Sequence, residues 1–339
     1  MIIIDGSYGE GGGQVLRTAL SLSLVTGAPF RIENIRGKRS RPGVMRQHVT
    51  AVEAACAVGG AACAELAVGA SELVFEPDRV APGEYRFAVG TAGSTSLVLQ
   101  TILPALMLAD APSRLVLEGG THNIHAPPFD FLTRIFLPIL NRMGPRVAAR
   151  LVRHGFYPAG GGRIEVDIDP CATLSPVELI ERGALRSVEA RAIVAALPGG
   201  IAARELDAAA KVLGWTDEAR RIEQLPDEVG PGNILMLEAV FDEAAELMSG
   251  FGQLGVPAQV VGEKAAKRMA GYLASGAVAG PYLADQLLLP FALAGGGCFT
   301  TVKPSQHSRT CAAVIARFLP IAFTFEEQAS GVWLVAARA

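Results

Sequence analysis

This 339-residue chain has few of the residues that build disulfide scaffolds, charged coats or secretion signals. Its five cysteines are widely spaced without a C-x-x-C pair, which argues against a disulfide framework or zinc ribbon and favours a reducing compartment. Only 19% of the residues are charged and the net charge is -3, which excludes a generally basic surface for nucleic acid but not a local basic patch. The N-terminal apolar run is too short for a signal peptide and no basic residue precedes it, so a cytoplasmic location is expected.

Hydrophobic residues are abundant, at 50% of the chain, so a large core and two or three domains are expected. One uncharged stretch, residues 87–109, is long enough to cross a bilayer. It contains Gly90, Ser94, Gln100 and Pro104, however, and a buried helix after a Gly/Ser loop fits this composition better than a membrane span.

One order of elements recurs along the chain: a Gly-rich or polar turn, an apolar helix, a short strand, a loop and a second helix. The copies cover residues 9–60, 90–144 and 282–320. Their first helices start near Gly13, Ser94 and Tyr282. The distance along the chain from the second start to the third is therefore about 100 residues longer than from the first to the second. A domain inserted within residues 183–279 would account for the excess, and its two joins should then lie close together. The alternative is ordinary strand–helix alternation without a repeat.

A Gly-rich turn, DGSYGEGGGQ at residues 5–14, precedes the first helix. Glycines allow a ligand to approach the backbone, and a helix N-terminus presents free N–H groups to an anion. The turn is neither a Walker A loop nor a dinucleotide fingerprint. Glu10 within it is a candidate Mg²⁺ or Mn²⁺ ligand, or else a carboxylate that complements the helix dipole.

A basic island occupies residues 31–46, with six cationic side chains against the single acid Glu33. The cations are Arg31, Arg36, Lys38, Arg39, Arg41 and Arg46. Arginine forks match phosphate oxygens, so the island predicts a phosphate site, with a solvated loop as the alternative. A helix is expected to begin at Pro42, and Arg17 in the first helix could point at the same anion.

His307 is the histidine best placed for chemistry, between the strand CFTTV and the last helix. A helix N-terminus would keep its imidazole neutral and attract phosphate oxygens, so a nucleophilic attack on a phosphoryl group is conceivable there. His122 and His125 have loose metal-ligand spacing, but no matching carboxylate or thiolate neighbours them in the sequence, so a loop role is favoured for them. A structural role remains the alternative for any single histidine.

The chain closely resembles the RNA 3′-terminal phosphate cyclases over nearly its whole length. The motifs that carry the resemblance, in this order, are GEGGGQVLRTALSLS, RPGVMRQH, GTAGSTSLVLQTILPAL, APPFDF, RHGFYPAGGG, GPGN, YLADQLLLPFALAGGG and QHSRT. The resemblance implies an α/β (α+β) fold whose body, residues 1–182 and 280–339, has three repeated βαβαββ units. These units are like the C-terminal domain of bacterial translation initiation factor three. A smaller α/β domain, residues 183–279, is inserted.

The resemblance also implies an ATP-dependent reaction that needs Mg²⁺ or Mn²⁺. A histidine-Nε2–AMP adduct forms, AMP passes to the RNA 3′-phosphate, and the neighbouring 2′-hydroxyl closes a 2′,3′-cyclic phosphate while AMP leaves. The partner is therefore an RNA 3′-phosphate end and no membrane. Broad apolar helices are compatible with a homodimer.

Position by position, the resemblance makes His307 the adenylated residue and Glu10 the metal ligand. The ATP-binding positions that it implies are Gln100, Pro128, Tyr282, Leu283, Ala284, Asp285 and Gln286. The positions lining the phosphate site are Arg17, Arg36, Arg39 and Gln47. The histidines of THNIHAPP stand where the family pattern suggests smaller or acidic residues, so the rim of the site is expected to differ from that of the family.

Two other classes of function compete with the cyclase. A cyclase-like binding protein of ribosome assembly would lack the catalytic histidine, so His307 argues against it. A small-molecule enzyme with similar repeats, such as an enolpyruvyl transferase, would carry its Lys/Arg clusters elsewhere and needs no histidine corner.

Overall fold

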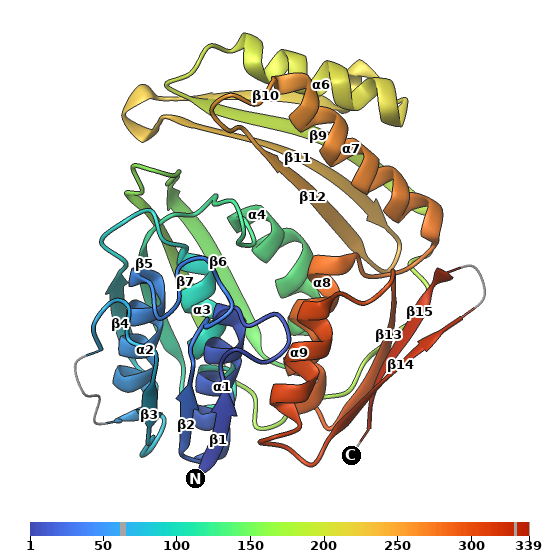
Figure 1. Cartoon of the computed structure of the whole chain (residues 1–339). Coiled ribbons are helices and arrows are strands. Elements are labelled where there is room, and N and C mark those ends of the chain that lie inside the picture. Colours follow the sequence, from blue (N-terminus) through green and yellow to red (C-terminus); the bar gives the residue numbers. More distant parts are fainter. Residues whose placement is uncertain (62–65, 329–330, 339) are drawn as a thin grey trace.

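The structure is a computed structural model that describes residues 1–61, 66–328 and 331–338, and it shows a mixed α/β protein (Figure 1). Within these residues three small sheets surround a group of helices, and a fourth sheet lies across the top of the view in Figure 1. The expected α/β fold class is confirmed. The three-fold repeat within it stays a prediction.

The first sheet and its helices come from the N-terminal residues. Its strand order is β1–β2–β3, with β1 parallel and β3 antiparallel to β2. The elements are β1 (Ile2–Asp5), α1 (Gly13–Thr26), β2 (Phe30–Glu33), α2 (Arg46–Gly59) and β3 (Leu73–Phe75). Helix α2 begins at Arg46 and not at Pro42, because Gly43 has a left-handed backbone (φ 78°) and Met45 is extended.

The second sheet has the order β4–β5–β7–β6, with β4 parallel to β5 and the other pairs antiparallel. Its strands are β4 (Glu84–Ala88), β5 (Ser113–Gly119), β6 (Arg146–Arg153) and β7 (Gly162–Asp169). Its helical segments are α3 (Thr95–Leu106), α4 (Phe129–Phe131), the π-helical turn η1 (Leu132–Phe136) and α5 (Leu137–Arg142). The uncharged stretch of residues 87–109 is therefore the end of a strand, a turn and one buried helix. None of the helices described here is long and apolar enough to cross a membrane.

The third sheet, with the order β14–β15–β13–β8, joins two distant parts of the chain. Its elements are β8 (Glu178–Leu179), α8 (Pro281–Leu293), β13 (Gly296–Thr301), α9 (Gln306–Ile315), β14 (Ala322–Glu327) and β15 (Trp333–Arg338). The chain leaves after β8 and returns before α8. The segment that follows β8 and the segment that precedes α8 both bond to the Thr300 side chain of β13. Its hydroxyl donates to Ile180 O (2.9 Å) and accepts from Val278 N–H (3.1 Å).

Residues 185–275, which we call the β9–α7 unit, form the fourth sheet in the order β10–β9–β11–β12. Its elements are β9 (Leu185–Ala195), α6 (Gly200–Leu213), the 3₁₀ turn η2 (Asp217–Ala219), β10 (Arg220–Leu225), the 3₁₀ turn η3 (Asp227–Val229), β11 (Gly232–Phe241), β12 (Ala245–Phe251) and α7 (Ala258–Ser275). Helices α6 and α7 cover the outer face of the sheet, and the other face is turned toward the body (Figure 1).

Strand β9 shows how this sheet is buried on both faces. Ala192 and Val194 pack in the cluster under α6 and α7, with Met269 of α7. Ile193 and Ala195 belong to the core of the body. Because successive side chains of a strand point to opposite faces, one strand serves two cores.

Ion pairs also fasten the β9–α7 unit to the body. Arg191 of β9 pairs with Asp130, which accepts a bond from His122 Nε2 at 2.9 Å. Burial lowers the pKa of His122 to about 3, so the ring is neutral. The sequence shows no carboxylate next to His122, but the fold brings Asp130 against its ring. His122 is therefore part of the contact between the body and the β9–α7 unit.

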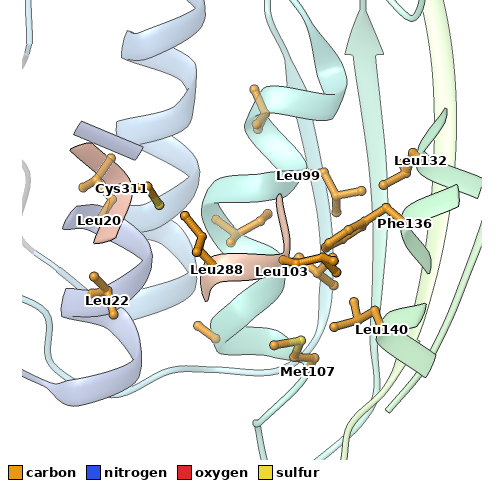
Figure 2. Packing of buried hydrophobic residues seen from close by; sticks show 14 of the residues in the cluster. Leu20, Leu22, Leu99, Leu103, Met107, Leu132, Phe136, Leu140, Leu288 and Cys311 are labelled. Atoms are coloured by element: carbon orange, nitrogen blue, oxygen red, sulfur yellow. The ribbon is translucent and has the colours of Figure 1, made fainter. Parts of the chain in front are cut away.

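Helices α1, α3, α8 and α9 meet in the core between the body sheets (Figure 2). The labelled contacts come from Leu20, Leu22, Leu99, Leu103, Met107, Leu132, Phe136, Leu140, Leu288 and Cys311.

Cys171, Cys298 and Cys311 are free thiols, whereas Cys56 is disulfide-bonded, which the spacing did not predict. Cys63 lies outside the described residues.

Candidate active site

His307 lies in the first turn of α9, and α8 holds that turn in place. Ser305 caps the helix by accepting the Ser308 N–H at 3.0 Å. Asp285 of α8 accepts bonds from both serine hydroxyls, the one from Ser305 at 2.9 Å. Burial raises the pKa of the Asp285 carboxyl, while the serine hydrogen bonds oppose that shift. The corner that carries His307 is therefore fixed by a partly buried polar network.

Gln14, at the start of α1, decides which nitrogen of His307 is available. Its Oε1 lies 2.5 Å from His307 Nδ1. A carbonyl oxygen only accepts, so Nδ1 carries a proton and donates it to Gln14. Nε2 is then the nitrogen that can attack a substrate, once the Glu10 carboxylate that contacts it has moved away and the ring is neutral.

The Gly-rich turn brings Glu10 against the same ring. Thr310 Oγ1 of α9 accepts the Glu10 N–H at 3.3 Å. Gly9 has a left-handed backbone (φ 58°), and a Cβ there would overlap Thr310, so glycine allows this close approach. Glu10 Oε2 contacts His307 Nε2, and Oε1 pairs with Arg39. One carboxylate therefore lies between His307 and a cation of the basic island.

Arg17 is the cation best prepared for an anionic ligand. No carboxylate among the described residues pairs with its guanidinium, and loss of hydration lowers its pKa to about 10. Arg36 instead donates to Arg41 O (2.6 Å) and Gly43 O (2.9 Å) and so shapes the loop of the basic island. A partly desolvated, unpaired guanidinium gains most from a phosphate oxygen.

His48 lies at this centre but was not selected from the sequence. Its Nδ1 accepts the Met45 N–H at 2.9 Å, so Nε2 carries the proton. Burial, with Arg17 and Arg36, lowers its pKa to about 3. A Cβ on Gly13 would overlap the His48 ring, so the ring lies against the start of α1. Its place in the first turn of α2, after the basic island, was the available signal.

A cavity of about 810 Å³ opens beside His307. The site residues on its wall are Gln14, Arg17, Gln100, Pro128, Tyr282, Asp285, Gln286 and His307. Gln100 of α3 donates to Gln286 of α8 across it. The β9–α7 unit supplies the facing part of the wall, where Arg268 donates to the Tyr282 hydroxyl at 3.0 Å.

Other sequence-selected residues lie off the cavity wall. Leu283 and Ala284 are buried in the helix packing around α8. Gln47 accepts the Ser94 N–H at 3.3 Å, beside the start of α3. Glu10 contacts His307 and Arg39 contacts Glu10, and neither residue lines the cavity.

Glu10 stands alone as a candidate metal ligand. The described part of the chain holds no group of three or more His, Cys, Asp or Glu side chains that could bind a metal ion. Magnesium, however, is commonly held by one or two carboxylates together with substrate phosphates and water. Glu10 Oε2 is buried and has His307 Nε2 as its only polar contact among the described residues, so it fits such a substrate-completed site.

Together, the mixed α/β fold and this site define an enzyme whose cavity brings His307 and the unpaired Arg17 to one wall. The chain belongs to the RNA 3′-terminal phosphate cyclase family, whose model matches residues 8–325. Two relatives named RNA 3′-terminal phosphate cyclase are each 53% identical to it. The relative from Koribacter versatilis (strain Ellin345) aligns over 97% of this chain and 92% of its own length. The relative from Ralstonia nicotianae (strain ATCC BAA-1114 / GMI1000) aligns over 96% and 94%.

Proposed function

We propose that the chain uses ATP to convert an RNA 3′-terminal phosphate into a 2′,3′-cyclic phosphate, through AMP carried on His307. Membership of the family supports the overall reaction. The observation that carries the covalent step is the contact of Gln14 Oε1 with His307 Nδ1, because an acceptor there keeps the ring proton on Nδ1 and so favours attack by Nε2.

In the first step His307 Nε2 attacks the α-phosphorus of ATP. A P–N bond forms, the bond from the α-phosphorus to the bridging oxygen of the β-phosphate breaks, and pyrophosphate leaves. Arg17 and Arg39 neutralise charge on the phosphate groups, which lowers the barrier to this departure. Gln14 stabilises the positive charge that develops on the imidazole.

In the second step a terminal phosphate oxygen of the RNA attacks the same α-phosphorus. The P–N bond breaks, His307 Nε2 regains its lone pair, and RNA(3′)pp(5′)A forms. The neighbouring 2′-hydroxyl then attacks the RNA phosphorus, loses its proton to solvent and expels AMP. Its fixed proximity supplies much of this acceleration.

Glu10 is proposed to bind Mg²⁺ or Mn²⁺ together with the phosphate oxygens of the nucleotide. The ion would neutralise charge on the departing pyrophosphate. Glu10 would thereby leave His307 Nε2, which it contacts in this structure. The carboxylate thus couples nucleotide arrival to exposure of the nucleophile.

The remaining residues are proposed to bind the nucleotide. Gln100, Pro128 and the α8 run Tyr282–Gln286 would hold ATP, with Leu283 and Ala284 acting through the packing of the helix. Arg36 and Gln47 would shape the phosphate site from outside the cavity. We also propose residues 1–182 and 280–339 as the catalytic body and 183–279 as an inserted domain. The hydrophobic cluster under α6 and α7, which is separate from the main core, supports this division.

The test is self-adenylation with α-labelled ATP and Mg²⁺ or Mn²⁺, without RNA. Label should remain on the wild-type protein, be labile in acid and stable in alkali, and be absent from His307→Ala. The matched control is His125→Ala, another cavity-lining histidine, which should retain labelling. Absence of label on the folded wild type, or labelling of His307→Ala, would overturn the covalent route.

A further inference from the structure

The β9–α7 unit forms one wall of the cavity that holds His307. Its contribution comes from β12, the following loop and α7, and includes Ser249, Phe251, Gln253, Lys264 and Arg268. These residues face the body elements that would hold ATP. The unit is therefore in contact with whatever fills the rest of the cavity.

The cavity wall is cationic although the chain as a whole carries a net charge of -3. Its full charges are Arg17, Lys264 and Arg268 against the acid Asp285, which is already bonded by two serine hydroxyls. Two of the three cations come from α7. A low-dielectric cavity with this charge attracts an anionic ligand.

Lys264 and Arg268 are four residues apart on α7 and so occupy the same face of the helix. Arg268 is held in place, donating to Ser249 O (2.5 Å) and to the Tyr282 hydroxyl (3.0 Å). Lys264 is exposed and has no ion pair with any described residue, whereas the neighbouring Glu263 pairs with Lys267. The Lys264 ammonium is thus free for a ligand.

Two substrates must meet in this one cavity if the proposed function is correct, because AMP passes from His307 to the RNA end. The body wall carries the residues proposed for ATP, and the polymer must continue beyond its terminal nucleotide. We propose that Lys264 and Arg268 bind the RNA strand at the phosphodiester that precedes its 3′-terminal nucleotide. The β9–α7 unit is then the RNA-binding wall of the site, an inference that rests on the proposed function.

The experiment compares Lys264→Ala with Lys267→Ala, which removes the same charge from α7 outside the cavity. KM for ATP is measured by self-adenylation, and KM for a 3′-phosphate RNA by cyclisation. Lys264→Ala should raise KM for RNA by about fivefold, the equivalent of one charge pair, and by much more than KM for ATP. The salt dependence of RNA binding should also fall by about 0.7 in logarithmic slope. Lys267→Ala should match wild type.

A second arm replaces the last phosphodiester of the RNA by a neutral methylphosphonate. This linkage should raise the wild-type KM for RNA, and should raise it by less in Lys264→Ala, where only Arg268 remains to contact the phosphate. Additive effects, a Lys264→Ala variant equal to Lys267→Ala, or an equal rise in KM for ATP would overturn the assignment. RNA affinity measured by fluorescence anisotropy needs no catalysis, so failure of the RNA contact is distinguished from failure of self-adenylation.

Discussion

Replacing Gln14 by alanine tests how the structure prepares its nucleophile. The substitution removes the acceptor 2.5 Å from His307 Nδ1 and leaves the ring free to carry its single proton on either nitrogen. Protonation at Nε2 would block the attacking position, and the imidazole would lose the partner that stabilises its developing charge. Gln14 is part of the cavity wall and not of the hydrophobic core, so the fold should tolerate the change.

The size of the effect follows from the strength of that bond. A hydrogen bond to a charged group contributes about 1.5–3 kcal/mol. Each 1.36 kcal/mol is tenfold in rate, so self-adenylation of Gln14→Ala should be about 10- to 150-fold slower. Gln14→Glu keeps an acceptor and should be less impaired than Gln14→Ala.

The assay is rapid-quench self-adenylation with labelled ATP at saturating nucleotide, which isolates the chemical step. A thermal unfolding midpoint close to that of wild type controls for misfolding. A Gln14→Ala rate within twofold of wild type would refute the role of the Nδ1 contact. Equal losses in Gln14→Glu and Gln14→Ala would show that side-chain shape, and not the acceptor, matters.

Two further predictions concern stability. Burial raises the pKa of Glu205 to about 7, so ionisation of this carboxyl penalises the folded state. The stability contributed by the protonated carboxyl is fully present below about pH 4.5 and is lost as the pH rises to about 7. The variant Glu205→Gln keeps the contact to Asn233 Nδ2 (3.0 Å). It should therefore raise the free energy of unfolding by up to about 3 kcal/mol more at pH 8 than at pH 5. An equal effect at both pH values in urea titrations would contradict this. Gly280→Ala should cost about 2–3 kcal/mol, because the new Cβ would overlap the buried Glu246 carboxylate and displace it from the Gly280 N–H (2.5 Å), and an unchanged urea midpoint would count against that contact.

Local signals explain why the sequence alone predicted much of the fold. The glycine run before α1, the corner before α9 and the apolar faces of α3 and α8 depend on neighbours in the chain. The strands β10 and β12 were missed. Half of the residues in RRIEQL are charged, and β10 lies at one edge of its sheet. Strand β12 lies at the other edge and pairs only with β11.

The candidate site shows the limit of sequence reasoning. His307 and Glu10 were selected for their residue types, their local setting and the family resemblance, but their mutual contact depends on α9 packing beside the first turn of the chain. Gln14 was not selected, because a glutamine carries no local mark of function. His48 was not selected either, although it follows the basic island.

The sequence by itself determined the fold class, most helices and the residues able to do chemistry, since these follow from short-range preference, hydrophobic periodicity and residue type. Only the tertiary structure decided which of them meet. Gln14 and His307 are 293 residues apart, and Lys264 reaches the same cavity from a helix outside the body. Such contacts follow from how sheets and helices pack, and packing is a property of the whole chain and not of any segment.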